Sequence, residues 1–237
     1  MVGTILNTAA IVAGGVCGHQ FGRLLKERHQ ETLTMACGVG TLFIGMAGAM
    51  NYMLHNDLFP GGGAMLIVAC LALGGLLGEI VDIEHKLEQF GEWLKIKTGN
   101  AKDQGFVNGF LTASLTVCIG AMAIVGAIRD GIAGDWSILG AKSVLDLIIV
   151  MVMTCSLGKG CLFSAIPVFL WEGALTLLAA AIKPIMTDAA MGYLSLVGNV
   201  LIFCVGINLV WGKRIRVANL LPAILFAVAA SFLPMTF

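Results

Sequence analysis

The chain has 237 residues, of which 58% are hydrophobic and only 12% are charged. Soluble domains carry about 25% charged residues, so this chain has too few charges to cover a water-exposed surface. Its formal net charge is zero, which excludes the broad basic surface that nucleic acid requires. The composition therefore predicts an all-α, polytopic integral membrane protein whose apolar surface contacts the lipid bilayer.

A helix needs about 20 mostly apolar residues to cross a bilayer. Six runs of about this length contain no Asp, Glu, Lys or Arg: 4–22, 32–56, 58–78, 104–128, 189–212 and 217–237. Two further runs, 143–158 and 161–182, contain one acid each, Asp146 and Glu172. We therefore expect about eight transmembrane segments in a single domain of residues 1–237, with a re-entrant hairpin as the alternative for the fifth and sixth segments.

The basic residues predict the orientation of these segments. If the first helix runs from outside to inside, eleven of the fourteen Lys and Arg residues fall on the inner side. Membrane proteins concentrate Lys and Arg in their cytoplasmic loops, so both termini are expected outside. The longest polar stretch, 79–103, falls on the inner side and repeats apolar residues at helical spacing. It predicts an amphipathic helix at the inner surface, with a solvated linker helix as the alternative.

The chain lacks the motifs of common catalytic and metal sites. Its seven cysteines and four histidines are scattered, without metal-ligand spacing. It contains no phosphate-binding Gly-x-x-x-x-Gly-Lys-Ser/Thr loop and no Gly-x-Ser-x-Gly nucleophile elbow. We therefore expect no catalytic residue, no cofactor and no metal site, and we do not expect an enzyme.

Two apolar stretches resemble each other. Residues 37–45 read CGVGTLFIG and residues 198–206 read GNVLIFCVG, and the expected topology places them on helices of opposite direction. The first three and the last three segments are thus candidates for an inverted repeat. Such repeats are typical of secondary transporters, whose sites lie near the middle of the membrane.

Several stretches resemble a known bacterial family over nearly the whole chain. They are GTILN at 3–7, LGGLLGE at 73–79, CIGAMAIVG at 118–126, AKSVLD at 141–146 and VANLLPA at 217–223, together with the DG, GD and SIL elements at 130–139. The chain resembles the YqgA/YdfK-like bacterial membrane-protein family of unknown function (DUF five-five-four). The resemblance implies a multi-pass protein of the bacterial cytoplasmic membrane without an assigned activity. It also implies a neutral amide at the position of Glu172 in many members, so that the acid is a departure.

Ionisable residues inside the predicted segments are the strongest candidates for a site, because an acid at a helix centre costs about 2.5–3.5 kcal/mol to insert. Glu172 lies midway along the sixth predicted segment, where it could bind a proton, a cation or a substrate, or stay protonated in a structural bond. Asp146 follows Lys142 by one helical turn, so the two can pair. Loop 129–136 before them predicts either an outer vestibule or a solvated loop with a helix cap.

Buried amides and small polar residues complete the candidate substrate site. Asn7 and Asn199 lie inside apolar segments and need hydrogen-bond partners there. Asn199 is central enough in its helix to meet Glu172. Ser143 adjoins Lys142 and is a weaker candidate.

Glycines at spacings of four predict close helix packing, either within one chain or between two. Gly14, Gly18 and Gly22 share one face of the first helix, and Gly74 and Gly78 share one face of the third. A homodimer is expected on this basis.

These features favour a gradient-driven transporter of a small solute or ion with a site near the middle of the membrane. The alternatives are an oligomeric channel assembled through the glycine seams and a non-transporting scaffold or regulator that acts through the surface helix. An intramembrane enzyme is the least supported, because no nucleophile and base are paired in the sequence.

Overall fold

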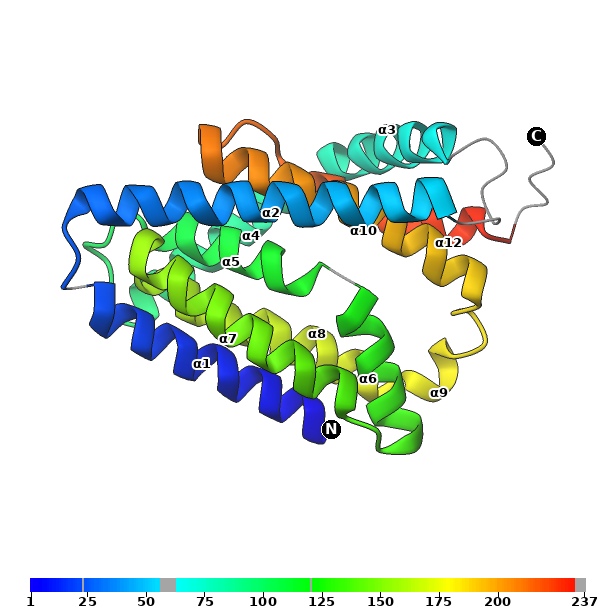
Figure 1. Ribbon diagram of the computed structural model, residues 1–237, viewed down its shortest axis with the longest axis horizontal. Coiled ribbons are helices and arrows are strands. Elements are labelled where there is room, and N and C mark those ends of the chain that lie inside the picture. The colour runs from blue at the N-terminus through cyan, green and yellow to red at the C-terminus, as the bar shows by residue number, and fades with distance from the viewer. Residues whose placement is uncertain (23, 56–62, 120, 233–237) are drawn as a thin grey trace.

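The computed structural model describes residues 1–22, 24–55, 63–119 and 121–232, and this part of the chain is helical without strands (Figure 1). Arg23, Gly120 and the ends of the predicted segments at 56–62 and 233–237 lie outside the described residues. The elements are α1 (Val2–Gly22), α2 (Glu27–His55), α3 (Ala64–Val81), α4 (Ile83–Lys97), α5 (Phe106–Cys118), α6 (Ala121–Ala133), α7 (Ser137–Leu157), η1 (Lys159–Ser164), α8 (Ala165–Leu177), α9 (Ala179–Ile182), α10 (Asp188–Trp211), α11 (Val217–Leu220) and α12 (Pro222–Ala230).

Six helical segments of the described chain are long and apolar enough to cross a membrane. They are α1, α2, α3, α7, the combined η1 and α8, and α10. Both predicted segments around residues 158–160 are among them, at 21 residues for Ser137–Leu157 and 19 residues for Lys159–Leu177. Large apolar side chains are exposed on these helices, for example Phe43, Val68 and Leu170. Exposed apolar surface of this extent is what a lipid environment requires.

The two other predicted segments are interrupted. Residues 104–128 were expected to form one helix, but α5 and α6 meet at 62°. Ile119 is extended there (φ −83°, ψ 113°), so the backbone leaves the helical path after α5. The described part of the last predicted segment contains α11 and α12, a shorter apolar helix that is broken before Pro222. Proline has no N–H to donate, and it suits the first turn of a new helix.

The glycine seam of α1 packs against α7 within the same chain. A Cβ at Gly14 would collide with the carbonyl oxygen of Leu147, and one at Gly18 with that of Met151. Gly3 meets Leu139 at the other end of the same contact, so the two helices run parallel. The absence of side chains on α1 lets the two backbones approach closely. This seam therefore gives no support to the predicted homodimer, which stays a prediction.

Two further helix pairs are antiparallel. Gly38 of α2 lies against Leu209 and Val210 of α10, whereas Gly48 lies against Asn199. In Figure 1, α2 extends along α10, on the side of the bundle away from α1. The second predicted glycine seam, on α3, is also filled from within the chain: Gly74 meets Ala223 and Gly78 meets Asn219.

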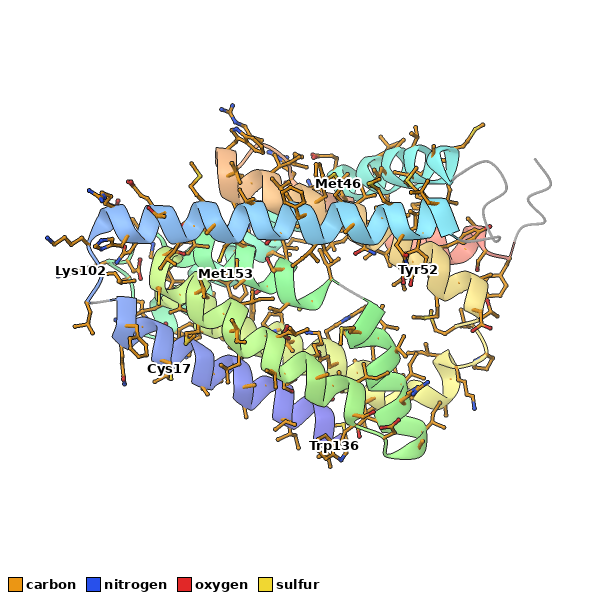
Figure 2. The ribbon with its side chains drawn as sticks, viewed as in Figure 1. Cys17, Met46, Tyr52, Lys102, Trp136 and Met153 are labelled. Atoms are coloured by element: carbon orange, nitrogen blue, oxygen red, sulfur yellow. The ribbon has the colours of Figure 1, made fainter. Side chains whose placement is uncertain are left out.

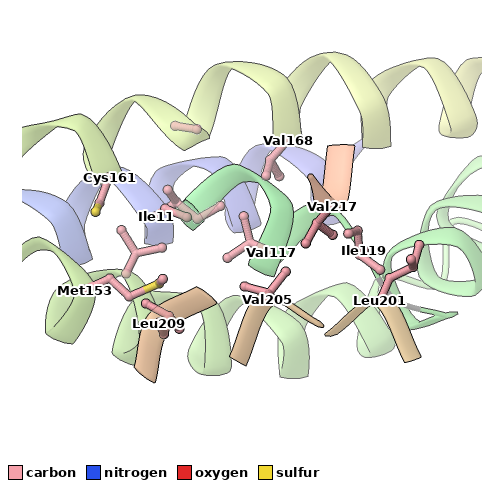
Figure 3. Packing of buried hydrophobic residues seen from close by; sticks show 13 residues of the cluster. Ile11, Val117, Ile119, Met153, Cys161, Val168, Leu201, Val205, Leu209 and Val217 are labelled. Carbon is pink, nitrogen blue, oxygen red and sulfur yellow. The ribbon is translucent and has the colours of Figure 1, made fainter. Parts of the chain in front are cut away.

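These contacts define two ends of the bundle. We call the end where α1 begins the amino-terminal end, and the end where α1 finishes the basic end, because Lys102 and Lys213 lie there. Figure 2 shows Lys102 and Cys17 toward the basic end, and Trp136 and Tyr52 toward the other. The main hydrophobic core lies between the ends and includes Ile11, Val117, Val168 and Val205 (Figure 3).

The predicted amphipathic segment 79–103 contains α4, although its first three residues belong to α3. Asp82 joins the two helices in the left-handed conformation (φ 51°). Leu94 of α4 is buried in a cluster with Phe106 and Phe110 of α5, whereas Trp93 is 52% exposed. The helix is therefore packed on α5 along one face.

Candidate functional site

Four polar residues meet inside the bundle, and we call them the buried quartet. They come from three of the segments that are long and apolar enough to cross a membrane. They are Asn7 of α1, Lys142 and Asp146 of α7, and Glu172 of α8, and none is more than 6% exposed. Lys142 and Asp146 lie one turn apart, so both point to the same side of α7. The tight contact between α1 and α7 brings Asn7 to them. The structure therefore brings together four of the six residues that the sequence predicted for the site.

Asn7 and Lys142 connect the two carboxylates of the quartet. The Asn7 amide nitrogen donates to Asp146 Oδ2 at 3.0 Å and to Glu172 Oε1 at 2.9 Å. The Lys142 ammonium forms an ion pair with Asp146 Oδ2 and lies 3.6 Å from Glu172 Oε1. A buried charge needs such partners, because its desolvation costs several kcal/mol.

Lys142 also binds the broken helix. Its ammonium donates to the carbonyl oxygen of Val117 at 2.9 Å. Val117 lies in the last turn of α5, where carbonyls lack helical N–H partners and carry the negative end of the helix dipole. A lysine therefore stabilises the interruption between α5 and α6. Sequence reasoning missed this role, because an uninterrupted helix was expected there.

Polar groups continue from the quartet toward the amino-terminal end. One turn away, Thr4 Oγ1 lies 3.2 Å from Thr176 Oγ1. Beyond them, the buried Asp130 carboxylate accepts a hydrogen bond from the Gly3 amide at 2.9 Å and pairs with the Met1 amino group at 2.8 Å. Sequence reasoning did not select the two threonines. Their signal was helical spacing, since Thr4 shares a face with Asn7 and Thr176 shares one with Glu172.

An apolar layer closes the quartet on the opposite side. Ile11, Val150 and Val168 each lie four residues from a quartet member on α1, α7 and α8, and each is fully buried. With Val117 they belong to the main core shown in Figure 3. The quartet thus has polar neighbours toward the amino-terminal end and hydrophobic neighbours toward the basic end.

A cavity of about 230 Å³ lies beyond this layer, toward the basic end. One face of α5 lines it with Asn108, Thr112 and Leu115. Thr34 of α2 and the buried Glu84 of α4 are on other walls. Because Leu115 precedes Val117 by two residues, the half-helix α5 borders the cavity and ends at the Lys142 contact.

An ion-pair cluster lies at this cavity. Lys213 Nζ is 2.6 Å from Glu84 Oε1, and it also pairs with Glu88. Partial burial acts to lower the pKa of Lys213, but the hydrogen bonds and charges of Glu84 and Glu88 outweigh it and raise this pKa above its ordinary value of 10.5. The protonated lysine therefore favours the folded state.

The Lys213 pairing predicts a pH dependence of stability. A raised lysine pKa contributes stability that is fully present below the ordinary pKa and is lost as pH rises through the folded-state pKa. Lys213→Met is therefore expected to be less stable than wild type at neutral pH, with the difference shrinking above pH 10.5. Thermal unfolding in detergent measures this, with the exposed Lys102→Met as control. A difference that stays constant through this pH range would contradict the assignment.

The other two predicted site residues lie outside the quartet. The Ser143 hydroxyl donates to the Leu139 carbonyl of its own helix at 2.7 Å. Asn199 donates to the Ser195 carbonyl at 2.8 Å and lies against Gly48 of α2. The expected meeting of Asn199 with Glu172 is therefore wrong, because this side of α10 packs on α2. Glu172 is also not midway along its segment but lies in the second half of Lys159–Leu177.

The predicted loop 129–136 is mostly helical. Arg129 to Ala133 belong to α6, which buries Asp130. Asp135 accepts hydrogen bonds from the hydroxyl and amide of Ser137, at 2.6 and 3.1 Å, at the start of α7. The hydrogen bonds from Ser137, more than the nearby Arg129, lower the pKa of the Asp135 carboxyl. Asp135 thus provides a partner for the first amide of α7, although Trp136 takes the N-cap position. The helical backbone and the buried Asp130 differ from the solvated loop of the second interpretation.

Comparison with known proteins assigns the family. The model of the family described as "Protein of unknown function (DUF554)" matches residues 2–232. The chain belongs to this family. It is 28% identical to the "Uncharacterized membrane protein YdfK" of Bacillus subtilis (strain 168), covering 98% of this chain and 96% of that protein. It is 29% identical to the "Uncharacterized protein YqgA" of Escherichia coli (strain K12), again covering 98% and 96%. No solved structure matches the chain.

The stretches that carry the family resemblance lie at the contacts described above. In GTILN, Gly3, Thr4 and Asn7 face the polar groups, whereas Ile5 and Leu6 are exposed. In LGGLLGE and VANLLPA, Gly74 of α3 meets Ala223 and Gly78 meets Asn219. The Asn219 side chain also accepts a hydrogen bond from the Glu84 amide at 2.7 Å, and so provides a partner for an N–H in the first turn of α4. AKSVLD contributes Lys142 and Asp146 to the quartet.

Proposed function

We propose that this protein is a gradient-driven transporter of a small solute. The observation that carries the proposal is the contact of a buried lysine with two carboxylates and with the end of a broken helix. Ionisable residues in membrane helices mark ion and substrate pathways, and transporters use interrupted helices at their sites. The chain would be a multi-pass protein of the bacterial cytoplasmic membrane.

The layers around the quartet fit alternating access. Polar groups extend from the quartet to the amino-terminal end, whereas Ile11, Val150 and Val168 separate it from the cavity at the basic end. A transporter must close its site to one side while it is open to the other. In this state the apolar layer would be the closed barrier between the quartet and the basic end. The cavity would be the entrance for solute from the basic end.

The topology proposed for the chain follows the charges. The bent pair α5 and α6 would form one span, and α11 and α12 another, which gives eight. The basic end would face the cytoplasm, with α4 at its surface, and both termini would lie outside.

Helix pairing supports the proposed inverted repeat of segments 1–3 and 6–8. Each corresponding pair packs antiparallel. Thr4 and Gly15 of α1 meet Thr176 and Leu162 of the sixth segment. The seventh segment, α10, packs antiparallel on α2, and the eighth segment packs antiparallel on α3. A pseudo-two-fold axis between the two triplets would produce this arrangement.

A thermal-stability screen in detergent tests the proposal. It would cover amino acids, carboxylates, nucleobases and sugars, because a ligand at 100 times its Kd stabilises the folded state by about 2.7 kcal/mol. We expect one solute class to stabilise the wild type and to lose its effect in Glu172→Gln. The same screen of Glu84→Gln shows whether the cavity also contributes to solute binding, because that contribution would weaken the stabilisation by the solute. If no solute stabilises either form, the transporter proposal fails and the scaffold alternative becomes the better account.

A further inference from the structure

The buried quartet has an unbalanced charge. Lys142 is its single cation, whereas Asp146 and Glu172 are two carboxylates. With all three ionised, the quartet carries one net negative charge inside a membrane-spanning bundle. An uncompensated charge in a low-dielectric interior is costly, so one more positive charge is needed.

Two oxygen atoms of the quartet are available for that charge. Glu172 Oε2 and Asn7 Oδ1 are fully buried and accept no hydrogen bond from the described residues. Asp146 differs, because Lys142 and Asn7 both donate to its Oδ2. Lys142 is closer to Asp146 than to Glu172, which it approaches only to 3.6 Å. Glu172 is therefore the less compensated of the two carboxylates.

A proton fits this position better than a metal ion. Hard metal ions are held by several oxygen ligands, commonly six or more. The Lys142 ammonium already lies between the two carboxylates and would repel a second cation there. The described chain also contains no group of three acidic, His or Cys side chains able to hold a metal ion. A proton adds almost no volume, and it removes the uncompensated charge by turning the Glu172 carboxylate into a neutral O–H donor.

In the described chain, α1, α5, α6, η1 and α9 pack on α8, and α7 reaches Glu172 through the Lys142 side chain. The charged and titratable groups nearest Glu172 come from α7, α5 and α6. They are Lys142 and Asp146 of α7, Cys118 at the end of α5, and Asp130 of α6 with the Met1 amino group, one polar layer away. Lys159 on η1 lies at the basic end. Of the charged groups in the described chain, Lys142 and Asp146 belong to the quartet with Glu172, whereas Asp130, the Met1 amino group and Lys159 lie outside it. The three ionisable members of the quartet therefore set its charge balance.

We propose that the buried quartet binds one proton on Glu172 and that this proton is the coupling ion of the transporter. The proposal rests on the proposed function. A proton from water forms the O–H bond at Glu172 and brings the quartet to zero net charge. Lys142 then keeps Asp146 and the Val117 carbonyl as partners. Loss of the proton restores the Glu172 carboxylate, which attracts Lys142 away from Val117 and loosens the end of α5 beside the cavity.

Infrared difference spectroscopy of the purified protein, without solute, tests the proton site. We expect a pH-dependent C=O stretching band of one protonated carboxyl group, which shifts in D2O. The band should be absent in Glu172→Gln and retained in Glu84→Gln, the matched change at a second buried glutamate of the described chain. Persistence of the band in a folded Glu172→Gln protein, or its absence from wild type at every pH at which the protein is folded, would overturn the proposal.

A second variant tests the charge count if Glu172→Gln does not fold. Asp146→Asn leaves Lys142 with one carboxylate, so the quartet is neutral without a proton. The protonated band is then expected to be lost at a pH where the wild type shows it, and its retention would contradict the count. Replacing choline by sodium in the buffer at fixed pH should change neither the carboxyl band nor the thermal stability of the protein. A sodium-dependent stabilisation abolished by Glu172→Gln would identify a metal ion instead. The infrared experiments use no solute, so they test proton binding independently of transport. A protein that binds the proton but is stabilised by no solute would contradict only the transporter proposal.

Discussion

Replacement of Lys142 by methionine is expected to destabilise the folded protein by about 3–5 kcal/mol, the cost of removing one partner from a buried ion pair. The change leaves Asp146 and Glu172 facing each other without a cation and leaves the Val117 carbonyl without its donor. Chemical unfolding in mixed micelles measures the loss. The exposed Lys183→Met is the control, and surface substitutions of this kind change stability by roughly 0.5 kcal/mol or less.

A double variant separates charge from packing. If the cost comes from uncompensated carboxylates, Lys142→Met/Asp146→Asn should be more stable than Lys142→Met alone, because one negative charge is removed with the positive one. Coupled neighbours depart from additivity in this way by 0.5–3 kcal/mol. Simple additivity of the two single changes would show that the quartet is not an electrostatic unit.

The second large effect is expected at the α1–α7 seam. Gly14→Ala places a methyl group on the backbone carbonyl of Leu147, which can move only if the whole of α7 shifts. Overpacking of this kind costs about 1–3 kcal/mol. The shift would also separate Asn7 from Asp146, so any function of the quartet should fall with the stability. Thermal unfolding and the solute screen measure the two effects.

The control for the seam is another glycine in a membrane helix. A Cβ at Gly40 of α2 would meet nothing within 4 Å. Alanine is preferred to glycine in a helix by about 1 kcal/mol, so Gly40→Ala should be neutral or stabilising. If both variants lose the same stability, the close contact of α1 with α7 is not what the glycines provide.

Composition and charge patterning predicted the class of this protein, because lipid requires apolar surface along whole helices. They also selected Asn7, Lys142, Asp146 and Glu172, since the cost of burying polar groups in a membrane makes each of them conspicuous. The residues that contact each of these four side chains could not be predicted. Which face of α8 or α10 turns inward depends on glycine contacts between distant segments, and this is why Asn199 was wrongly placed beside Glu172.

The interruption between α5 and α6 was hidden for a different reason. Residues 104–128 contain no Asp, Glu, Lys or Arg and are mostly apolar, so their composition is that of one continuous span. The feature that stabilises the break is a lysine on another helix, 25 residues away from Val117 in the sequence. For Asp130 the error was the reverse. Its charged and turn-forming neighbours predicted a loop, whereas the residue is buried in a helix.

The most direct test of transport uses proteoliposomes with an imposed pH gradient. A mixture of candidate solutes is supplied outside, and mass spectrometry identifies what accumulates within. We predict that one solute class accumulates with wild-type protein, that a protonophore abolishes the accumulation, and that Glu172→Gln fails to accumulate it although the protein is folded. Accumulation that survives both the protonophore and Glu172→Gln, or none with folded wild-type protein, would contradict the account.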